Sequence, residues 1–245
     1  MMAVAVEVGK GADVTALSPL KAKRAPKFRE AAYAQIKEAI LDGRFVPPQP
    51  ILEEDLAEAL QVSRTPVREA LAILQHEGLL APRNGRGLYV RSVTRDEFVA
   101  MFSANEVIEP YLVRRAALLA TEAEIAELWV VLEREAECAR TANMPAFFRV
   151  GRDFHRLIGE ACGNLPLTRF IIENEERTDL YLLSRGESIG SHRMTASNEE
   201  HREILKAIER RDPDAAAQLA IVHSQLIRRR LTDLFEETTP VSEID

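Results

Sequence analysis

The sequence predicts a mainly α-helical protein in two parts: a small domain of three helices and a β-hairpin, then an antiparallel all-α bundle of six or seven helices. Apolar residues recur three and four positions apart along most of the chain, which is the spacing of one helix face. A hairpin pattern occurs at 79–91, around a polar turn that contains glycines. From residue 94 onward, capping residues divide the chain into helices without a strand pattern between them.

The first part consists of four predicted segments. We expect helices at 32–41, 53–60 and 63–78, followed by the hairpin at 79–91. Gly43 suits the end of the first helix, and the prolines between positions 47 and 50 form a stiff connector to the second. Three helices followed by a hairpin are typical of a winged helix-turn-helix, a fold that binds DNA.

The third of these helices begins in a run that suits DNA recognition. Ser63 and Thr65 are good capping residues, and Pro66 fits a first helical turn because its missing N–H leaves no hydrogen bond unmade. Arg64 and Arg68 are four residues apart and therefore lie on one face. Arginines and small hydroxyls at the exposed start of a short helix fit the major groove, where arginine pairs with guanine. Taken alone, the run is equally compatible with a surface helix whose arginines are solvated.

The tip of the hairpin is a second candidate DNA contact. Arg83 and Arg86 lie in its turn, from which they can reach the DNA backbone or the minor groove. Gly87 can supply the positive φ that such a turn requires. We therefore expect DNA contacts from the start of the third helix and from the wing, namely Ser63, Arg64, Thr65, Arg68, Arg86 and Gly87.

This segment resembles the DNA-binding domain of the GntR family of bacterial transcription regulators. The matching positions keep their order throughout: Tyr33-x-x-Ile36, Ile40-Leu41-x-Gly43, Leu52-x-x-x-Leu56-Ala57-Glu58, Val62 to Leu71, Glu77-Gly78-Leu79 and Gly87-x-x-Val90. One departure is Gln49, which follows Pro48 where the family usually has glycine; it alters a loop and leaves the recognition helix intact. The resemblance implies a homodimer that places two recognition helices in successive major grooves of a palindromic double-stranded operator.

Charge is distributed unevenly along the chain. Residues 23–95 contain 12 basic and 9 acidic residues, whereas residues 96–245 contain 18 and 28. The net charge of −7 therefore belongs to the second part, and we expect DNA contact to be confined to the first. Cys138 and Cys162 lie in apolar helical patterns, as expected of core residues in a reducing cytoplasm. No apolar stretch reaches 18 residues, so we expect no membrane span.

The second part is predicted to be helical throughout. Thr94-x-x-Glu97 and Thr121-x-x-Glu124 are capping boxes that open its first two helices, and Pro110 is expected to kink the first of them. Four more helices follow: Pro145 to Cys162, Leu165 to about Ser184, about Asn198 to Arg211, and Pro213 to about Glu236, with a loop at 186–197. We therefore expect a flexible tail at 1–27, a DNA-binding domain at 28–93, an effector-binding and dimerisation domain at 94–236, and a frayed tail at 237–245.

Three of the five histidines are the candidate chemical groups of the bundle. His155, His201 and His223 fall on the apolar sides of three different helices, so their imidazoles can meet in the interior. Neutral imidazole is a good ligand for Zn²⁺ or Ni²⁺. The alternative is that each histidine is isolated and satisfied by a hydrogen bond of its own.

The bundle also resembles the FCD effector domain of the FadR subfamily. The matching motifs are Phe154-His155-Arg156-x-Ile158, Ala161-x-Gly163-Asn164, Glu200-His201-Arg202-x-Ile204-Leu205-x-Ala207-Ile208 and Ala220-x-x-His223. In metal-binding members these three histidines are ligands, and the resemblance implies the same here, with a divalent metal such as Zn or Ni as cofactor.

Two departures from that subfamily affect the expected site. Its metal-binding members carry an aspartate ligand four residues before the first histidine, where this chain has Gly151. Asp153 is near in sequence but about 200° around the helix, so it should point elsewhere. Asn105 stands where the family tends to have an arginine. We expect a pocket lined by the histidines, Asn105 and Gly151 that accepts a small effector.

Together these observations predict a cytoplasmic, ligand-responsive transcription regulator without enzymatic activity. The resemblance implies repression that a metabolite relieves, often an organic acid. Two other classes stay open. One is a metal-dependent enzyme whose histidines activate water, although the sequence offers no convincing general base beside them. The other is an architectural DNA binder with a purely structural bundle.

Overall fold

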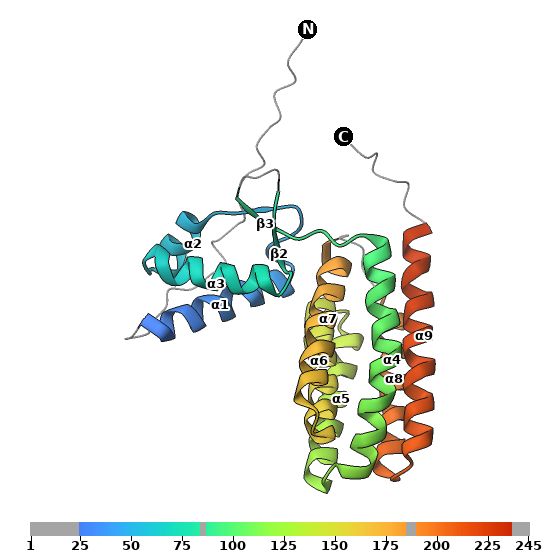
Figure 1. Cartoon of the computed structure of the whole chain (residues 1–245). Coiled ribbons are helices and arrows are strands. Elements are labelled where there is room, and N and C mark those ends of the chain that lie inside the picture. The colour runs from blue at the N-terminus through green and yellow to red at the C-terminus, as the bar shows by residue number, and fades with distance from the viewer. Residues whose placement is uncertain (1–24, 84–86, 185–189, 237–245) are drawn as a thin grey trace. The chain divides into compact units, whose positions relative to one another are not determined.

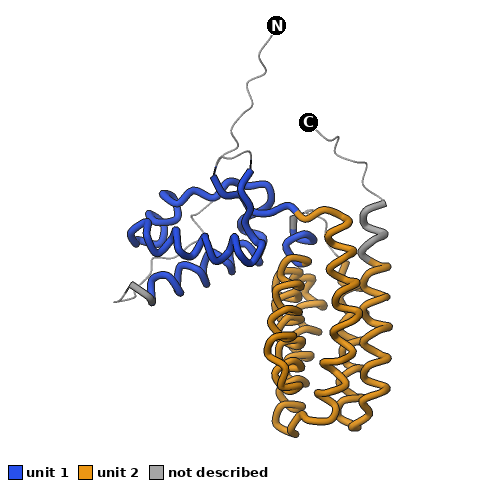
Figure 2. Tube along the Cα trace, in the orientation of Figure 1, with its two compact units in different colours: residues 1–92, 179–186 blue, residues 93–178, 187–245 orange. Residues whose placement is uncertain are grey.

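The computed structural model describes the backbone of residues 25–83, 87–184 and 190–236 (Figure 1). The chain divides into two compact units, residues 1–92 with 179–186 and residues 93–178 with 187–245 (Figure 2). Each unit has a hydrophobic core of its own. Most of the expected tails lies outside the described residues.

The first unit contains helices and a small antiparallel sheet. Its elements are α1 (Ala25–Leu41), β1 (Pro50–Ile51), α2 (Glu53–Leu60), α3 (Arg64–His76), β2 (Leu80–Pro82) and β3 (Leu88–Val90). The strand order is β1-β3-β2, so β3 lies in the centre and pairs with β2 as the predicted hairpin. The winged helix-turn-helix expected from the sequence is thereby confirmed.

Burial in α3 follows the predicted helical period. Val67, Ala70, Leu71 and Leu74 are buried, and they pack into a core shared with α1, α2 and the sheet. The opposite face of the helix is exposed, because it carries arginine and glutamate side chains that retain their hydration. The helix that is expected to read DNA is therefore anchored by its apolar side.

Two features of this unit differ from the expectation. Helix α1 begins at Ala25, well before Ala32 and inside the segment predicted to be a tail, and Phe28 is half-buried in this added stretch. The proline connector ends in a strand, since Pro50 pairs with Tyr89 and Ile51 with Leu88. Proline is tolerated in an edge strand, and Ile51, which is buried, ties this strand to the core.

The second unit is built from six helices within the described residues. They are α4 (Arg95–Leu119), α5 (Glu122–Arg140), α6 (Met144–Cys162), α7 (Leu165–Ser184), α8 (Ser191–Glu209) and α9 (Pro213–Glu236), and the last turn of α7 is grouped with the first unit. Both predicted capping boxes are present, at Thr94 and Thr121. Helix α4 runs through Pro110 without a break. None of the described helices combines the length and hydrophobicity that a membrane crossing requires.

The predicted loop at 186–197 is wrong over its second half. Helix α8 begins at Ser191, seven residues before the expected start at Asn198. The added turns bury Met194 and Ser197, and Ser191 Oγ donates a hydrogen bond of 2.6 Å to the carbonyl of Ala139. Tertiary packing thus stabilises a helix start that carries weak local signals.

The core of the bundle holds the histidine-bearing helices together. Helix α5 packs against α6 and α8, α4 packs against α9 and α6, and α8 packs against α9. Large apolar side chains such as Leu128, Phe154 and Leu205 are completely buried between them. These contacts bring the inner faces of α6, α8 and α9 toward one another.

Candidate functional sites

The start of α3 is the candidate DNA-reading surface. Ser63 precedes the helix in an extended conformation, but its side chain makes no capping hydrogen bond. Its hydroxyl therefore does not cap the helix, contrary to the capping role expected for it. Ser63, Arg64, Thr65 and Arg68 are all exposed, on the side of α3 that faces away from the core. These four side chains are accessible to a DNA duplex.

Both candidate arginines form ion pairs with the first turn of α2. Arg68 makes a bidentate contact with Glu53, with nitrogen–oxygen distances of 2.9 and 3.1 Å. Arg64 pairs with Glu54. Sequence reasoning missed these acidic partners, which lie 10 and 15 residues away and meet the arginines only because α2 packs on α3. In this structure both guanidinium groups are therefore already paired with carboxylates.

The wing is described only in part. Gly87 is exposed with φ of +69°, and a Cβ atom there would have no neighbour within 4 Å, so the backbone angle rather than space is the reason for glycine. Arg86 lies outside the described residues. Arg83, on the other side of the turn, is exposed.

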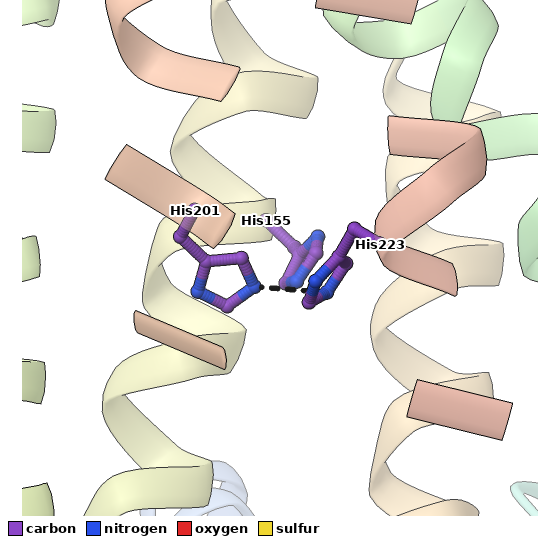
Figure 3. Close-up of side chains that lie close together, drawn as sticks. All are labelled: His155, His201 and His223. Atoms are coloured by element: carbon purple, nitrogen blue, oxygen red, sulfur yellow. Dashed lines mark hydrogen bonds between the residues drawn. The ribbon is translucent and has the colours of Figure 1, made fainter. Parts of the chain in front are cut away.

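The three predicted histidines meet inside the second unit (Figure 3). His155 comes from α6, His201 from α8 and His223 from α9, and one nitrogen of each lies within 4.8 Å of the others. His201 Nε2 and His223 Nε2 are 3.2 Å apart. His201 and His223 are buried, and the side chain of His155 is 14% exposed. The inward faces predicted from the sequence are confirmed.

Carboxylates hold the outer nitrogens of these rings. His201 Nδ1 lies 3.0 Å from both oxygens of Glu135, and His223 Nδ1 lies 2.8 Å from Glu200 Oε2. Carboxylate oxygens accept hydrogen bonds, so each Nδ1 carries the proton and donates it. The two Nε2 lone pairs then face each other, and they repel unless a proton or a cation lies between them. His155 Nδ1 faces Glu175 Oε1 at 3.5 Å.

Comparison with known proteins identifies both units. The model described as "Bacterial regulatory proteins, gntR family" matches residues 28–90, and the FCD domain model matches residues 100–226. The chain belongs to the GntR family and carries an FCD domain. It is a regulator that binds DNA, as the resemblance implied.

Individual relatives agree with this family membership. The chain is 28% identical over 211 residues to the uncharacterised HTH-type transcriptional regulator YdhC of Bacillus subtilis, covering 84% of this chain and 91% of that protein. It is 26% identical to the HTH-type transcriptional repressor RspR of Escherichia coli, covering 84% and 90%. The fold is similar to that of E. coli McbR/YncC, with a TM-score of 0.75 and 21% identity over 85% of this chain and 98% of that one.

The two expected effector contacts of this GntR-family protein, Asn105 and Gly151, lie on different helices and have different neighbours. Asn105 is buried on α4 and accepts a hydrogen bond of 2.6 Å from Asn174 Nδ2. Gly151, on α6, faces the carboxylate of Glu135. Asp153 points away, as predicted, and pairs with Arg156. The roles of Asn105 and Gly151 as effector contacts stay predictions.

The buried groups have shifted pKa values. Burial lowers the pKa of His155 well below its ordinary value, and the neighbouring His201 and His223 lower it further. Burial and then His201 also lower the pKa of His223. Burial acts in the same direction on His201, but the facing Glu135 carboxylate raises its pKa above the ordinary value. Of the three histidines in the metal-free centre, His201 is therefore the one that most readily carries a positive charge.

Sequence reasoning missed the carboxylates of the centre. The sequence marks Glu200 only as a motif position, but its side chain is 18% exposed and contacts both His223 and Arg230. Glu135 is completely buried. In the sequence, Glu200 directly precedes His201, and Glu135 lies on a mostly apolar helix face. Neither position is a signal strong enough to identify the residue as part of the centre.

Proposed function

We propose that this GntR-family regulator is a repressor that binds a palindromic operator as a homodimer and releases it when a small organic acid binds the FCD domain. The observation that carries the ligand-responsive part is the buried polar centre, in which three histidines from three helices converge beside buried carboxylates. Buried polar groups of this kind are costly unless they serve a ligand or a network. The relative RspR of E. coli is a transcriptional repressor, which supports the proposed direction of control.

His155, His201 and His223 are the proposed ligands of a divalent metal, Zn or Ni. Two of the three donors have the spacing of zinc ligands, because two imidazole nitrogens on a tetrahedral zinc ion lie about 3.3 Å apart, given Zn–N distances of about 2.05 Å. The 3.2 Å between His201 Nε2 and His223 Nε2 matches this separation. When bound, the ion supplies a positive charge that attracts a carboxylate ligand.

An open groove on the surface of the bundle reaches His223, one of the three histidines. It lies between α8 and α9, has a volume of ≈ 480 Å³, and includes Glu200, His223 and Arg230 in its lining. Arg230 is paired with Glu200 there. An organic acid in the groove would contact the guanidinium group of Arg230 and the ring of His223. Asn105 stays a proposed contact deeper in the bundle.

Helix α4 offers a surface for the proposed homodimer. Val107, Tyr111 and Leu118 lie on one face of this helix and are exposed, Val107 to 76%. Large apolar side chains gathered on one helix face are typical of an interface between protein chains. Two copies joined in this way would present two α3 helices to the half-sites of an operator.

Ser63, Arg64, Thr65 and Arg68 are the proposed DNA contacts of α3, with Arg86 and Gly87 in the wing. A protein that reads bacterial DNA works in the cytoplasm, and that location is part of the proposal. The histidine centre is proposed to bind ligand and to catalyse no reaction. The relatives named above are regulators, which supports this assignment.

The test is a binding assay on the full-length protein with DNA from its own promoter region. Fluorescence anisotropy at fixed salt should show specific binding, and a panel of organic acids should include one that weakens it. Elemental analysis of the purified protein should find a metal, and His201→Ala should remove it. Failure to bind any promoter fragment at low ionic strength, with or without the acids, would contradict the proposed function.

A further inference from the structure

Gly151 lies in the middle of α6. At such a position almost any other residue stabilises a helix more than glycine does. Glycine inside a helix costs about 1 kcal/mol relative to alanine. A Cβ atom placed on Gly151 would lie 3.3 Å from Glu135 Oε1, a tighter contact than most real Cβ atoms make. The space beside Gly151 is thus occupied by the carboxylate of Glu135.

Glu135 is a fully buried acid with a short set of partners. Both of its oxygens lie 3.0 Å from His201 Nδ1, and Asn198 Nδ2 donates to Oε2 at 2.8 Å. Arg202 Nε donates in turn to Asn198 Oδ1 at 3.1 Å. The neutral amide of Asn198 thus lies between the guanidinium group of Arg202 and the carboxylate of Glu135. A buried carboxylate is costly unless a positive charge lies nearby.

The position of Glu135 determines how His201 presents its other nitrogen. Because Glu135 accepts the Nδ1 proton, the Nε2 lone pair of His201 is directed toward His223 and the centre of the cluster. A carboxylate behind a ligand histidine fixes its ring orientation and makes it more basic. Phe154 stacks on the same ring, with 4.7 Å between the ring centres, and restricts its rotation.

We propose that Glu135 is a positioning residue that supplies a negative charge to the metal centre through His201. Glycine at position 151 leaves room for the Glu135 carboxylate. This inference rests on the metal site proposed above. The negative charge lies behind a ligand and is not itself a ligand, so a coordination position stays free for the carboxylate of an effector. An aspartate at 151 and a glutamate at 135 disfavour each other, because a Cβ atom at 151 would lie 3.3 Å from Glu135 Oε1 and the aspartate would add a second negative charge there.

The experiment is a titration of metal-stripped, full-length protein with Zn²⁺ by calorimetry and with Co²⁺ by visible absorption. Four proteins are compared: the unsubstituted chain, Glu135→Gln, Gly151→Asp and the double variant. Glu135→Gln should bind metal about 10- to 100-fold more weakly, which is the usual effect of losing such a partner. Glu127→Gln, an exposed acid on the same helix, is the matched control and should leave the affinity unchanged.

The double variant separates a charge role from a structural one. Gly151→Asp alone should bring no gain in affinity, whereas in the Glu135→Gln protein it should restore binding and change the Co²⁺ spectrum, since aspartate then enters the ligand set. An equal gain from Gly151→Asp in both backgrounds would overturn the inference. So would an unchanged affinity in Glu135→Gln.

The outcomes also separate this inference from the proposed metal site. If the unsubstituted protein binds neither ion, both are overturned. If it binds and Glu135→Gln binds equally well, only the role of Glu135 fails. Circular dichroism checks that each variant folds. If Glu135→Gln does not fold, the Gly151→Asp variant decides the question. Tighter metal binding by that variant contradicts the expected conflict between an aspartate at 151 and Glu135, and equal or weaker binding supports it.

Discussion

Replacing Glu109 by glutamine should stabilise the metal-free protein, and increasingly so as the pH rises. Glu109 is buried on α4, where burial raises its pKa from 4.5 to about 7, although the hydrogen bond from Ser224 Oγ acts in the opposite direction. Between these two values the folded chain holds a proton that the unfolded chain has lost. The stability contributed by this group is therefore fully present below about pH 4.5 and is lost as the pH rises through about 7.

The magnitude follows from the two pKa values. A difference of about 2.5 corresponds to about 3 kcal/mol between low pH and pH 8. Glutamine has nearly the same size, and its carbonyl can still accept the Ser224 hydroxyl, but it carries no charge. The gain in the free energy of unfolding of Glu109→Gln over the unsubstituted protein should grow by about 3 kcal/mol from pH 4.5 to pH 8.

The assay is urea unfolding of chelator-treated protein at several pH values, followed by the fluorescence of Trp129. This is the only tryptophan in the chain and it lies on α5, so its signal reports on the bundle. Glu127→Gln, which removes an exposed acid from the same bundle, is the control and should change stability by less than about 0.5 kcal/mol. A difference between Glu109→Gln and the unsubstituted protein that does not vary with pH would refute the reasoning.

Three further substitutions test the reading surface and the core. Arg68→Ala should cost about 1–3 kcal/mol of specific operator binding if the side chain reads a base, and unchanged anisotropy at fixed salt would exclude that role. Glu53→Gln releases Arg68 from its ion pair and removes a negative charge beside the DNA, so it should tighten binding most strongly at low salt; a gain that persists at high salt would argue against this electrostatic cause. Phe154→Ala empties a fully buried position against His201 and should lower the free energy of unfolding by about 3–5 kcal/mol, measured by urea.

Much of the architecture could be predicted from the sequence, because helices are specified by local periodicity and by their ends. The bounds of α2 and the capping boxes at Thr94 and Thr121 agree with the expectation. The helix starts at Ala25 and Ser191 were missed. At Ser191 the preceding residue makes no side-chain capping hydrogen bond, and packing stabilises the helix start instead. A strand of two residues, such as β1, is too short for any pattern of alternation to reveal it.

The amino-acid sequence by itself determined which side chains turn inward. His155, His201 and His223 each occupy an apolar helix face, and Arg64 and Arg68 share an exposed one, because 3.6 residues per turn relates position to direction within a single helix. Only the tertiary structure decided which acids stand beside them. Glu135 reaches His201 from another helix, 66 residues away in sequence, and the 39 acidic residues of the chain offer no local mark that distinguishes it. Contacts between helices depend on how their faces pack, and that packing is a property of the whole chain.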